Sequence, residues 1–281
     1  MPADVLKNLV RAVVPRPVRN WLRSPTRSAE WLWDAARFSL GAVETLDFSP
    51  GRSIVCHPHA YRVACRSQIA DPEQSAEFQN FLAHCSATML LFDLGAHFGL
   101  FSLAAAQFGG RAVAVDPSPA AAEMMAKQVK MNRCADRVRI LQAAVSDAPG
   151  QLNMLNAGVF SDGYFRLVRG RSTRELSPAT ATTIDQMAQE FGPPTHIKID
   201  VEGHEAAALR GGRATLSHAS PILFIELHNE MVASDGGDPH AALDELAAMG
   251  YGTFSLAGSP IAKSEILDKP ISRIVARPVH T

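Results

Sequence analysis

The stretch Lys198-Ile199-Asp200-Val201-Glu202-Gly203-His204-Glu205 gives the strongest indication of the fold. It begins in the β-branched run His196-Ile197-Lys198-Ile199, which predicts a buried strand. Ligands of open α/β sheets bind beyond the carboxyl ends of strands, where three carboxylates and a histidine gather here. Acidic residues are favourable at the start of a helix because of the helix dipole, which partly explains the presence of Glu202 and Glu205. It does not account for Asp200, because an unpaired carboxylate at a buried strand end is costly, so we predict a site role for Asp200.

A glycine turn follows an earlier strand of the chain. The continuous apolar run Met89-Leu90-Leu91-Phe92 predicts a strand buried on both faces. It leads into Asp93-Leu94-Gly95-Ala96-His97-Phe98-Gly99 and then into a helical stretch from Leu100 to Phe108. The glycines allow the backbone to pass close to a ligand. Their G-x-x-x-G spacing differs from the G-x-G-x-x-G spacing of dinucleotide sites, so no pyrophosphate cradle is predicted.

The next predicted strand ends in an acidic residue. Arg111-Ala112-Val113-Ala114-Val115 is followed by Asp116, which is placed to accept hydrogen bonds from ribose hydroxyls. A lone glycine turn would be weak support for a cofactor site. The turn, the acid after the second strand and the carboxylates after the later strand together predict one.

These motifs resemble the FkbM family of S-adenosylmethionine-dependent methyltransferases, and the resemblance runs from about Leu90 to Ser255. The matching elements are Asp93-x-Gly95-x-x-x-Gly99, Asp116-Pro117-Ser118-Pro119, Asn132, Ala144-Val145-Ser146-Asp147, Thr183-Ile184-Asp185, Lys198-Ile199-Asp200-Val201-Glu202-Gly203-x-Glu205 and Ile225-Glu226-Leu227-His228. The family often has Asn where His97 stands and Glu where Asp116 stands. Aspartate at this position keeps the ribose acceptor but has a shorter reach.

The resemblance implies where the cofactor lies. Asp93, Gly95 and Ala96 would line its methionine part, Asp116 would hold the ribose, and residues 143–147 would flank the adenine. The predicted cofactor contacts are Asp93, Gly95, Ala96, His97, Gly99, Asp116, Pro117, Ala143, Ala144 and Asp147. Asp147 has an equally good interpretation as a turn residue before Pro149-Gly150.

The acceptor hydroxyl has a high pKa and gains from a base within hydrogen-bond reach. Asp200 is the leading candidate, and His204, Glu226 and His228 are the alternatives. Glu226 and His228 alternate with apolar residues on a predicted strand, so both point to the same side. Asp200, Glu226 and His228 could also bind a divalent ion. We do not favour that interpretation, and we assign no metal ligand from the sequence.

Composition and charge restrict the class of protein. The 281 residues are 47% hydrophobic and 20% charged, with a net charge of −1, so nucleic acid is not an expected partner. No stretch is long and apolar enough to span a bilayer, and the opening residues do not show the pattern that we would expect of a signal peptide. The four widely spaced cysteines suit reduced thiols in a cytoplasmic enzyme. Zinc at Cys56-His57-Pro58-His59 and Cys65 is not favoured, because the spacing matches no standard zinc site.

The chain divides into residues 1–85, an N-terminal extension, and residues 86–281, the S-adenosylmethionine-binding domain. Residues 1–45 combine an amphipathic stretch, six basic residues before position 28 and all three tryptophans. Such a segment suits a peripheral membrane contact through residues 1–40. We favour packing on the domain or on a homodimer partner, because the apolar face is short.

Secondary structure is predicted from periodicity. Residues 46–70 are expected to form a small antiparallel sheet, and 72–85 a helix. Strands at 89–94, 111–116, 137–145, 196–201, 221–227, 251–256 and 272–277 alternate with helices, including one over 204–218. Residues 148–182 interrupt the alternation as a long connection, whose Arg166, Arg169, Arg171 and Arg174 are either a solvated run or a contact for an anionic substrate.

The predicted fold is therefore α/β, a doubly wound seven-stranded class I methyltransferase (Rossmann-like) sheet with an N-terminal helical and β extension. Its last strand is expected to pair antiparallel. The resemblance implies O-methylation of a hydroxyl on a sugar, a glycosylated metabolite or a polyketide-type metabolite, with a small-molecule or glycan substrate. The alternatives are a non-catalytic cofactor-binding module and a membrane-surface methyltransferase of glycolipids.

Overall fold

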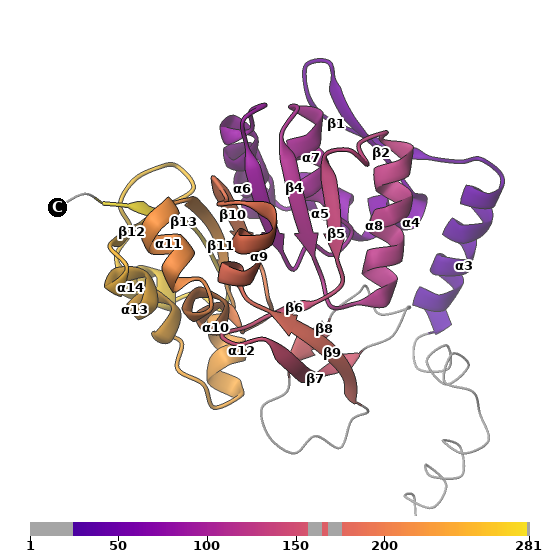
Figure 1. The fold of residues 1–281 in the computed structure, drawn as a ribbon. Helices are drawn as coiled ribbons and strands as arrows, with labels where there is room; N and C mark the ends of the chain where they lie inside the picture. The colour runs from indigo at the N-terminus through magenta and orange to yellow at the C-terminus, as the bar shows by residue number, and fades with distance from the viewer. Residues whose placement is uncertain (1–24, 157–164, 168–175, 280–281) are drawn as a thin grey trace, which may run out of the picture.

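A seven-stranded sheet forms the centre of the protein (Figure 1). The computed structural model describes residues 25–156, 165–167 and 176–279. The sheet order is β12-β13-β11-β10-β3-β4-β5, and the strands in that order are Tyr251–Phe254, Ser272–Pro278, Ile222–Leu227, His196–Ile199, Leu90–Leu94, Arg111–Val115 and Val138–Leu141. Strands β11, β10, β3, β4 and β5 run parallel, whereas β13 pairs antiparallel with β11 and β12. The predicted doubly wound sheet with an antiparallel last strand is confirmed.

The order of the strands reverses between β3 and β10. From β3 the chain builds outward to β4 and β5, and from β10 it builds in the other direction to β11. Crevices beyond the carboxyl ends of strands at such a reversal are the ligand sites of open α/β sheets. The turns that follow β3 and β10 therefore face the same crevice.

Apolar residues on both faces of the strands create two cores. Leu91 and Ala112 belong to one core, while Leu90, Phe92 and Val113 belong to the other, as successive side chains of a strand point to opposite faces. Helices cover both faces of the sheet (Figure 1). The helices that follow β3 in the chain are α7 Leu100–Gln107, α8 Pro119–Met131, α9 Ile184–Phe191, α10 Glu205–Arg210, α11 Arg213–Ala219, α12 Asn229–Ser234, α13 Ala241–Ala248 and α14 Lys263–Leu267.

The N-terminal extension contains more helix than the sequence predicted. Its elements are α3 Pro25–Ser39, β1 Glu44–Ser49, β2 Arg52–Cys56, α4 Pro58–Ala60, the π-helix η1 Tyr61–Cys65, α5 Arg66–Ala70 and α6 Pro72–His84. The antiparallel sheet is limited to β1 and β2, so the prediction of strands over residues 57–70 is wrong. Pro58 occupies the first turn of a helix, where its fixed φ is favourable, and the His57 side chain accepts a hydrogen bond from the His59 amide.

The extension shares a core with the sheet. Phe78 and Phe81 of α6 are buried, and both rings contact Phe101 of α7 edge-on. Phe81 also contacts Phe224 of β11. The boundary between residues 1–85 and 86–281 stays a prediction, because these contacts continue one apolar core across it.

Residues 137–182 differ from the predicted strand and connection. The predicted strand 137–145 is two strands, since β6 Ala144–Val145 leaves the main sheet and pairs with β9 Leu176–Thr182. The predicted long connection contains β7 Gly150–Asn156 and β8 Phe165–Leu167, which complete a second sheet of order β6-β9-β7-β8. This pairing joins segments far apart in the sequence, so local periodicity did not reveal it. The arginines assigned to this connection lie outside the residues whose side chains are described.

The predicted helix over residues 204–218 is also two helices. The break between α10 and α11 falls at Gly211-Gly212. A Cβ atom on Gly211 would lie 2.1 Å from the carbonyl oxygen of Ser146, and one on Gly212 would lie 2.9 Å from Ile184. Both glycines are needed for close packing against the segment around β6 and against α9.

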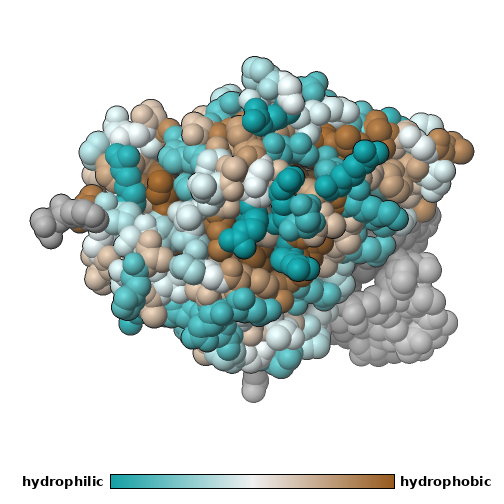
Figure 2. Space-filling view, turned by 45° about the horizontal axis from the view of Figure 1, so that its top comes forward, coloured by the Kyte–Doolittle hydropathy of each residue, from teal (hydrophilic) through white to brown (hydrophobic). Residues whose placement is uncertain are grey.

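Hydrophilic and hydrophobic residues are interspersed on the face shown in Figure 2, as on most protein surfaces in contact with water. Three large apolar side chains of the segment around α3 are exposed, namely Leu32, Trp33 and Leu40. Among the described residues, none of the helices has the length and apolar character that crossing a bilayer requires.

Gly95→Ala should destabilise the fold strongly. Gly95 has a φ of +78°, and an added Cβ would lie 1.7 Å from the Asp200 carbonyl oxygen, so strands β3 and β10 would have to separate. We expect the free energy of unfolding in urea to fall by more than about 3 kcal/mol. Gly236→Ala is the matched control, because Gly236 has a φ of +74° and no atom within 4 Å of the added Cβ. Equal losses in the two variants would contradict the proposed clash.

Candidate functional site

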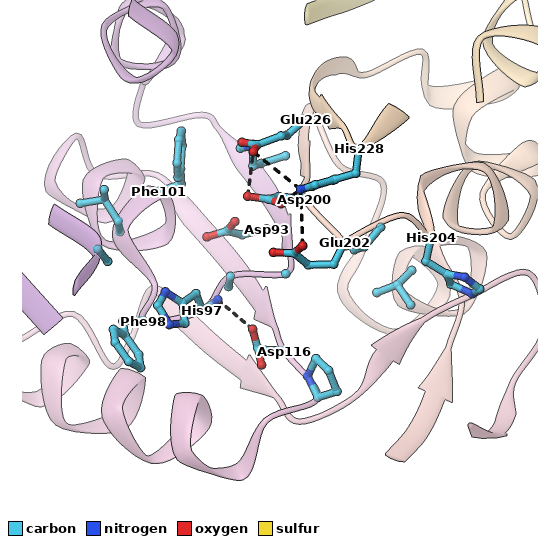
Figure 3. Close-up of a pocket in the computed structure, with 18 of the residues that line it drawn as sticks. Asp93, His97, Phe98, Phe101, Asp116, Asp200, Glu202, His204, Glu226 and His228 are labelled. Atoms are coloured by element: carbon cyan, nitrogen blue, oxygen red, sulfur yellow. Dashed lines mark hydrogen bonds and ion pairs between the residues drawn. The ribbon is translucent and has the colours of Figure 1, made fainter. Parts of the chain in front are cut away.

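A cavity of about 620 Å³ opens at the carboxyl ends of β3, β4, β10 and β11 (Figure 3). This volume is within the usual range for small-molecule sites. The cavity is lined by these residues predicted from the sequence: Asp93, Gly95, Ala96, His97, Asp116, Pro117, Ala143, Ala144, Asp200, His204, Glu226 and His228. Gly99 and Asp147, also predicted as cofactor contacts, are not among its lining residues.

The turn after β3 forms one wall of the cavity. The amide groups of Gly95 and Ala96 donate hydrogen bonds to the carbonyl oxygen of Val115, at 2.9 and 3.0 Å. Asp93 is buried and accepts hydrogen bonds from the amide and hydroxyl groups of Ser102, at 3.0 and 2.7 Å. Burial raises the pKa of Asp93, although the Ser102 hydrogen bonds oppose this. Asp93 therefore fixes the start of α7 relative to the turn.

Asp116, which follows the neighbouring strand β4, binds the backbone of the turn after β3. Its two carboxylate oxygens accept hydrogen bonds from the amide groups of His97, at 2.9 Å, and Ser118, at 2.8 Å. Burial raises the pKa of Asp116 to about 7, and the two hydrogen bonds limit the rise. Each oxygen retains a second acceptor site, so the carboxylate can also receive hydroxyl protons of a ligand in the cavity.

His97 contributes its backbone amide to the turn, as the donor of the hydrogen bond to Asp116. It adopts a φ of 50°, in the left-handed region, which turns its amide toward Asp116. Its ring stacks on Phe98 with centroids 3.7 Å apart. Gly99 precedes α7 with a φ of +81°, and an added Cβ would meet Met125 at 3.2 Å, so its role is close packing.

A group of carboxylates surrounds His228 at the opposite wall (Figure 3). Nε2 of His228 lies 3.8 Å from Asp200, 3.6 Å from Glu202 and 3.7 Å from Glu226, measured to the carboxylate oxygens. Its Nδ1 lies 2.8 Å from Glu205. These distances confirm that Asp200, Glu226 and His228 are close together, as the strand pattern indicated.

Burial changes the acid–base properties of this group. It raises the pKa values of Asp200 and Glu226, and it raises the pKa of Glu202 to about 7. Burial opposes the charged form of His228, but Glu205, Asp200 and Glu202 outweigh it and raise the pKa of His228 to about 9. Ionising all of these carboxylates together is therefore unfavourable unless a positive partner lies beside them.

His204 and Asp147 lie apart from that group. Nε2 of His204 lies 3.0 Å from the Ser146 hydroxyl, and Figure 3 shows its side chain away from the carboxylates. Asp147 is half-exposed and pairs with Arg210 at 3.3 Å. The geometry thus fits the interpretation of Asp147 as a surface turn residue better than a contact in the cavity.

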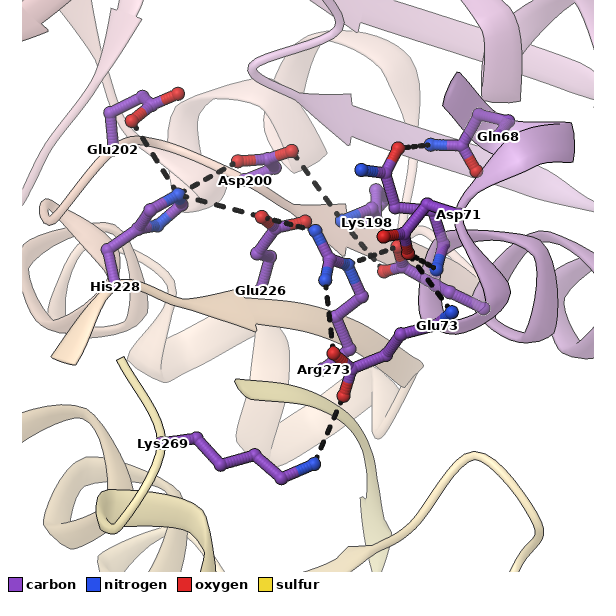
Figure 4. Close-up of polar contacts among 12 residues, drawn as sticks. Gln68, Asp71, Glu73, Lys198, Asp200, Glu202, Glu226, His228, Lys269 and Arg273 are labelled. Atoms are coloured by element: carbon purple, nitrogen blue, oxygen red, sulfur yellow. Dashed lines mark hydrogen bonds and ion pairs between the residues drawn. The ribbon is translucent and has the colours of Figure 1, made fainter. Parts of the chain in front are cut away.

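Sequence reasoning missed a buried ionic connection to the extension (Figure 4). Glu77 of α6 is 1% exposed and lies 2.9 Å from Lys198 Nζ and 3.4 Å from Arg273 Nε. Lys198 lies 3.9 Å from Asp200, and Arg273 donates a 2.8 Å hydrogen bond to Glu226. One carboxylate of the extension thus holds both cations that contact the candidate catalytic acids. Nothing in the local pattern of α6 separates Glu77 from an ordinary helix-surface residue.

The residues of the cavity fit S-adenosylmethionine. Its ribose has two hydroxyl donors, which Asp116 can accept, and its sulfonium and ammonium groups are cationic, which suits a cavity with surplus carboxylates. The sheet order and the cavity at the strand reversal define the class I methyltransferase fold. Asp93, Gly95 and Ala96 are the residues that would lie along the methionine part.

Comparisons with known proteins place the chain in a family. A family model described as "Methyltransferase FkbM domain" matches residues 93–252, more than half of the chain. The chain belongs to the FkbM family of S-adenosylmethionine-dependent methyltransferases.

Individual relatives are more distant. Ribosomal protein L11 methyltransferase of Desulfitobacterium hafniense is 30% identical over 81 residues, and the match spans 28% of this chain and 26% of that protein. The structure of methyltransferase FkbM from Methylobacillus flagellatus has a TM-score of 0.47 and 16% identity, over 78% of this chain and 54% of that one. An O-methyltransferase from Bacillus cereus in complex with SAH has a TM-score of 0.43 and 13% identity, over 98% and 97% of the two chains. The family assignment rests on the family model.

Glu77→Gln should show whether the extension stabilises the site. Removing one charge of a buried pair leaves Lys198 and Arg273 partly uncompensated, so we expect a loss of about 3 kcal/mol in the free energy of unfolding. Glu73→Gln on the same helix is the control, because the more exposed Glu73 should contribute less than about 1 kcal/mol. Urea unfolding measures both. Similar small losses in the two variants would show that the buried bridge is not important for stability.

Proposed function

We propose that the chain is an O-methyltransferase that methylates a hydroxyl group of a sugar, a glycosylated metabolite or a polyketide-type metabolite. The observation that carries the proposal is the position of Asp200. Its backbone packs against Gly95 of the cofactor turn, and its carboxylate opens into the same cavity beside Glu226 and His228. This position supports a role for Asp200 as the base next to the predicted position of the methyl donor.

The lining of the cavity supports a hydroxyl-rich acceptor. The N-terminal extension contributes the polar side chains Glu30, Arg62, Gln68 and Gln74. Such groups can donate hydrogen bonds to hydroxyls and accept them, which favours a sugar-like substrate over a purely apolar one. The extension would then determine which acceptors enter, while the sheet holds the cofactor.

Each residue has a defined part in the proposed reaction. S-adenosylmethionine supplies an electrophilic methyl group on a sulfonium. Asp116 holds the ribose, and the turn at Gly95 and Ala96 positions the methionine part. Asp200 anchors the acceptor and takes its hydroxyl proton while the oxygen bonds to the methyl carbon and the carbon–sulfur bond breaks. Orienting the two reactants can lower the barrier by roughly 7–11 kcal/mol.

A membrane-surface methyltransferase of glycolipids is the second candidate. The specific observation in its favour is the exposure of Leu32, Trp33 and Leu40 around α3, at 52%, 67% and 89%. The same apolar residues would suit a homodimer contact. Flotation of the chain with anionic liposomes, compared with a chain lacking residues 1–40, separates the two, because a dimer contact does not require lipid.

S-adenosylhomocysteine should bind and stabilise the protein. At a concentration of about 100 times its Kd, a ligand of the native state adds roughly 2.7 kcal/mol, which raises the melting temperature. Asp116→Ala should weaken this binding in calorimetry at least tenfold, because the ribose acceptor is lost. Asp147→Ala is the matched control and should bind normally, since Asp147 lies outside the cavity. Stronger binding of NAD than of S-adenosylhomocysteine would refute the cofactor assignment.

Asp200→Asn should separate chemistry from binding. The amide keeps the shape and hydrogen-bonding atoms but cannot take a proton, so the methylation rate should fall about a hundredfold or more. Binding of S-adenosylhomocysteine should be largely kept. The rate is measured as product formation on a panel of sugar and glycoside acceptors. Near-normal turnover in the folded variant would transfer the catalytic role to His204, Glu226 or His228, and no turnover of any acceptor by the natural chain would favour a non-catalytic binding module.

A further inference from the structure

The side chain of His228 lies between two sets of carboxylates, Glu205 on one side and Asp200, Glu202 and Glu226 on the other, and Figure 4 shows the second set. It is 4% exposed, and its Nδ1 lies 2.8 Å from Oε1 of Glu205, so Nδ1 is the nitrogen that donates to this carboxylate. A histidine whose Nδ1–H is committed in this way holds its Nε2 in a fixed direction, and Nε2 can become a metal ligand when its proton is released on metal binding. Carboxylate–histidine pairs of this kind orient metal-ligating histidines.

Nε2 of His228 points into the centre of three carboxylates. The nearest oxygens of Glu202, Glu226 and Asp200 lie 3.6, 3.7 and 3.8 Å away. All three distances exceed those of hydrogen bonds. Among the described residues, this nitrogen therefore lies at ion-pair distance from carboxylate oxygens on three sides, at the wall of the cavity.

One potential ligand atom from each of Asp200, Glu226 and His228 lies within 4.8 Å of the others. The strands β10 and β11 are parallel neighbours, so Asp200 and His228 follow them at the same edge of the sheet, and Glu226 points to the same side as His228. The side chain of Asp200 is 34% exposed toward the cavity, which leaves room for a further ligand from solvent or substrate. The ligands are thus preorganised by rigid elements and open on one side.

The neighbouring cations do not balance the charge of this group. Lys198 and Arg273 contact Asp200 and Glu226, but both also contact Glu77. The carboxylates of Glu202 and Glu205 each form an ion pair with His228. Excess buried negative charge is stable only with a bound cation or with protons.

We propose that Asp200, Glu226 and His228, with Glu202 beside them, bind a divalent cation of the Mn²⁺ or Mg²⁺ type. One imidazole with two or three carboxylates is a donor set that suits Mn²⁺ in particular, since carboxylates favour hard ions and imidazole favours transition metals. This inference rests on the proposed function for its role, in which the cation would hold the acceptor hydroxyl and lower its pKa beside the methyl donor. It reverses the preference drawn from the sequence, because only the structure shows the orientation of Nε2.

The test is a titration with Mn²⁺ in which electron paramagnetic resonance measures the concentration of the free ion. The full chain is treated with chelator, which is then removed, and S-adenosylhomocysteine is added. We expect one Mn²⁺ bound per chain, with Mg²⁺ competing for it. His228→Gln and Glu226→Gln should each weaken binding at least tenfold. Glu205→Gln, which removes the charge behind His228 without removing a ligand, should weaken it about 10-fold to 100-fold.

Matched controls exclude a general effect of charge. His218→Gln and Glu190→Gln change exposed residues of α11 and α9 and should leave Mn²⁺ binding unchanged. Circular dichroism of each variant verifies the fold. The proposal is overturned if the natural chain binds no stoichiometric Mn²⁺ at millimolar concentration, or if His228→Gln binds it as well as the natural chain does, in which case His228 is an imidazolium that balances the carboxylates.

The metal and the methyl transfer can be judged separately. Full methylation activity after chelation, together with absent Mn²⁺ binding, would refute the cation and leave the proposed function standing. Stoichiometric Mn²⁺ binding that depends on His228, without methylation of any hydroxyl acceptor, would support the cation site and contradict the proposed function.

Discussion

The close contact between the turn after β3 and the backbone after β10 is the constraint on which the rest of the site depends. The Asp200 amide donates to the Leu94 carbonyl at 2.9 Å, and the Asp200 carbonyl occupies the space that a side chain at Gly95 would fill. Parallel pairing of β3 and β10 brings the cofactor turn and the acidic strand end to one edge. Without that contact, neither the cofactor residues nor the acids would share a cavity.

Electrostatics imposes the second constraint. Carboxylates are costly to bury, yet Asp93, Asp116, Glu226 and Asp200 all line the cavity. Each is held by a particular compensation: Ser102 for Asp93, two amides for Asp116, and Lys198 or Arg273 for the acids near His228. The remaining negative charge makes the cavity suited to cationic ligands, and a sulfonium cofactor and a divalent ion are both of this kind.

The extension belongs to the site as much as to the surface. Glu77 contacts the cations beside the candidate catalytic acids, while Glu30, Arg62, Gln68 and Gln74 line the cavity. In the proposed function, the polar lining from the extension would select the acceptor, and the central acids would take part in the reaction.

The sequence by itself determined the sheet, its antiparallel last strand and most of the cavity, because strand periodicity and strand-end acids are local features. It did not determine the split at 142–143, the second sheet around β7 and β9, or the break at Gly211-Gly212, since these depend on contacts between distant segments. The position of Asp147 in the sequence predicted a cofactor contact, but its side chain pairs with Arg210 outside the cavity. Only the tertiary structure decided the role of Glu77 and the direction of His228 Nε2, because ion pairs across elements leave no periodic signal in the chain.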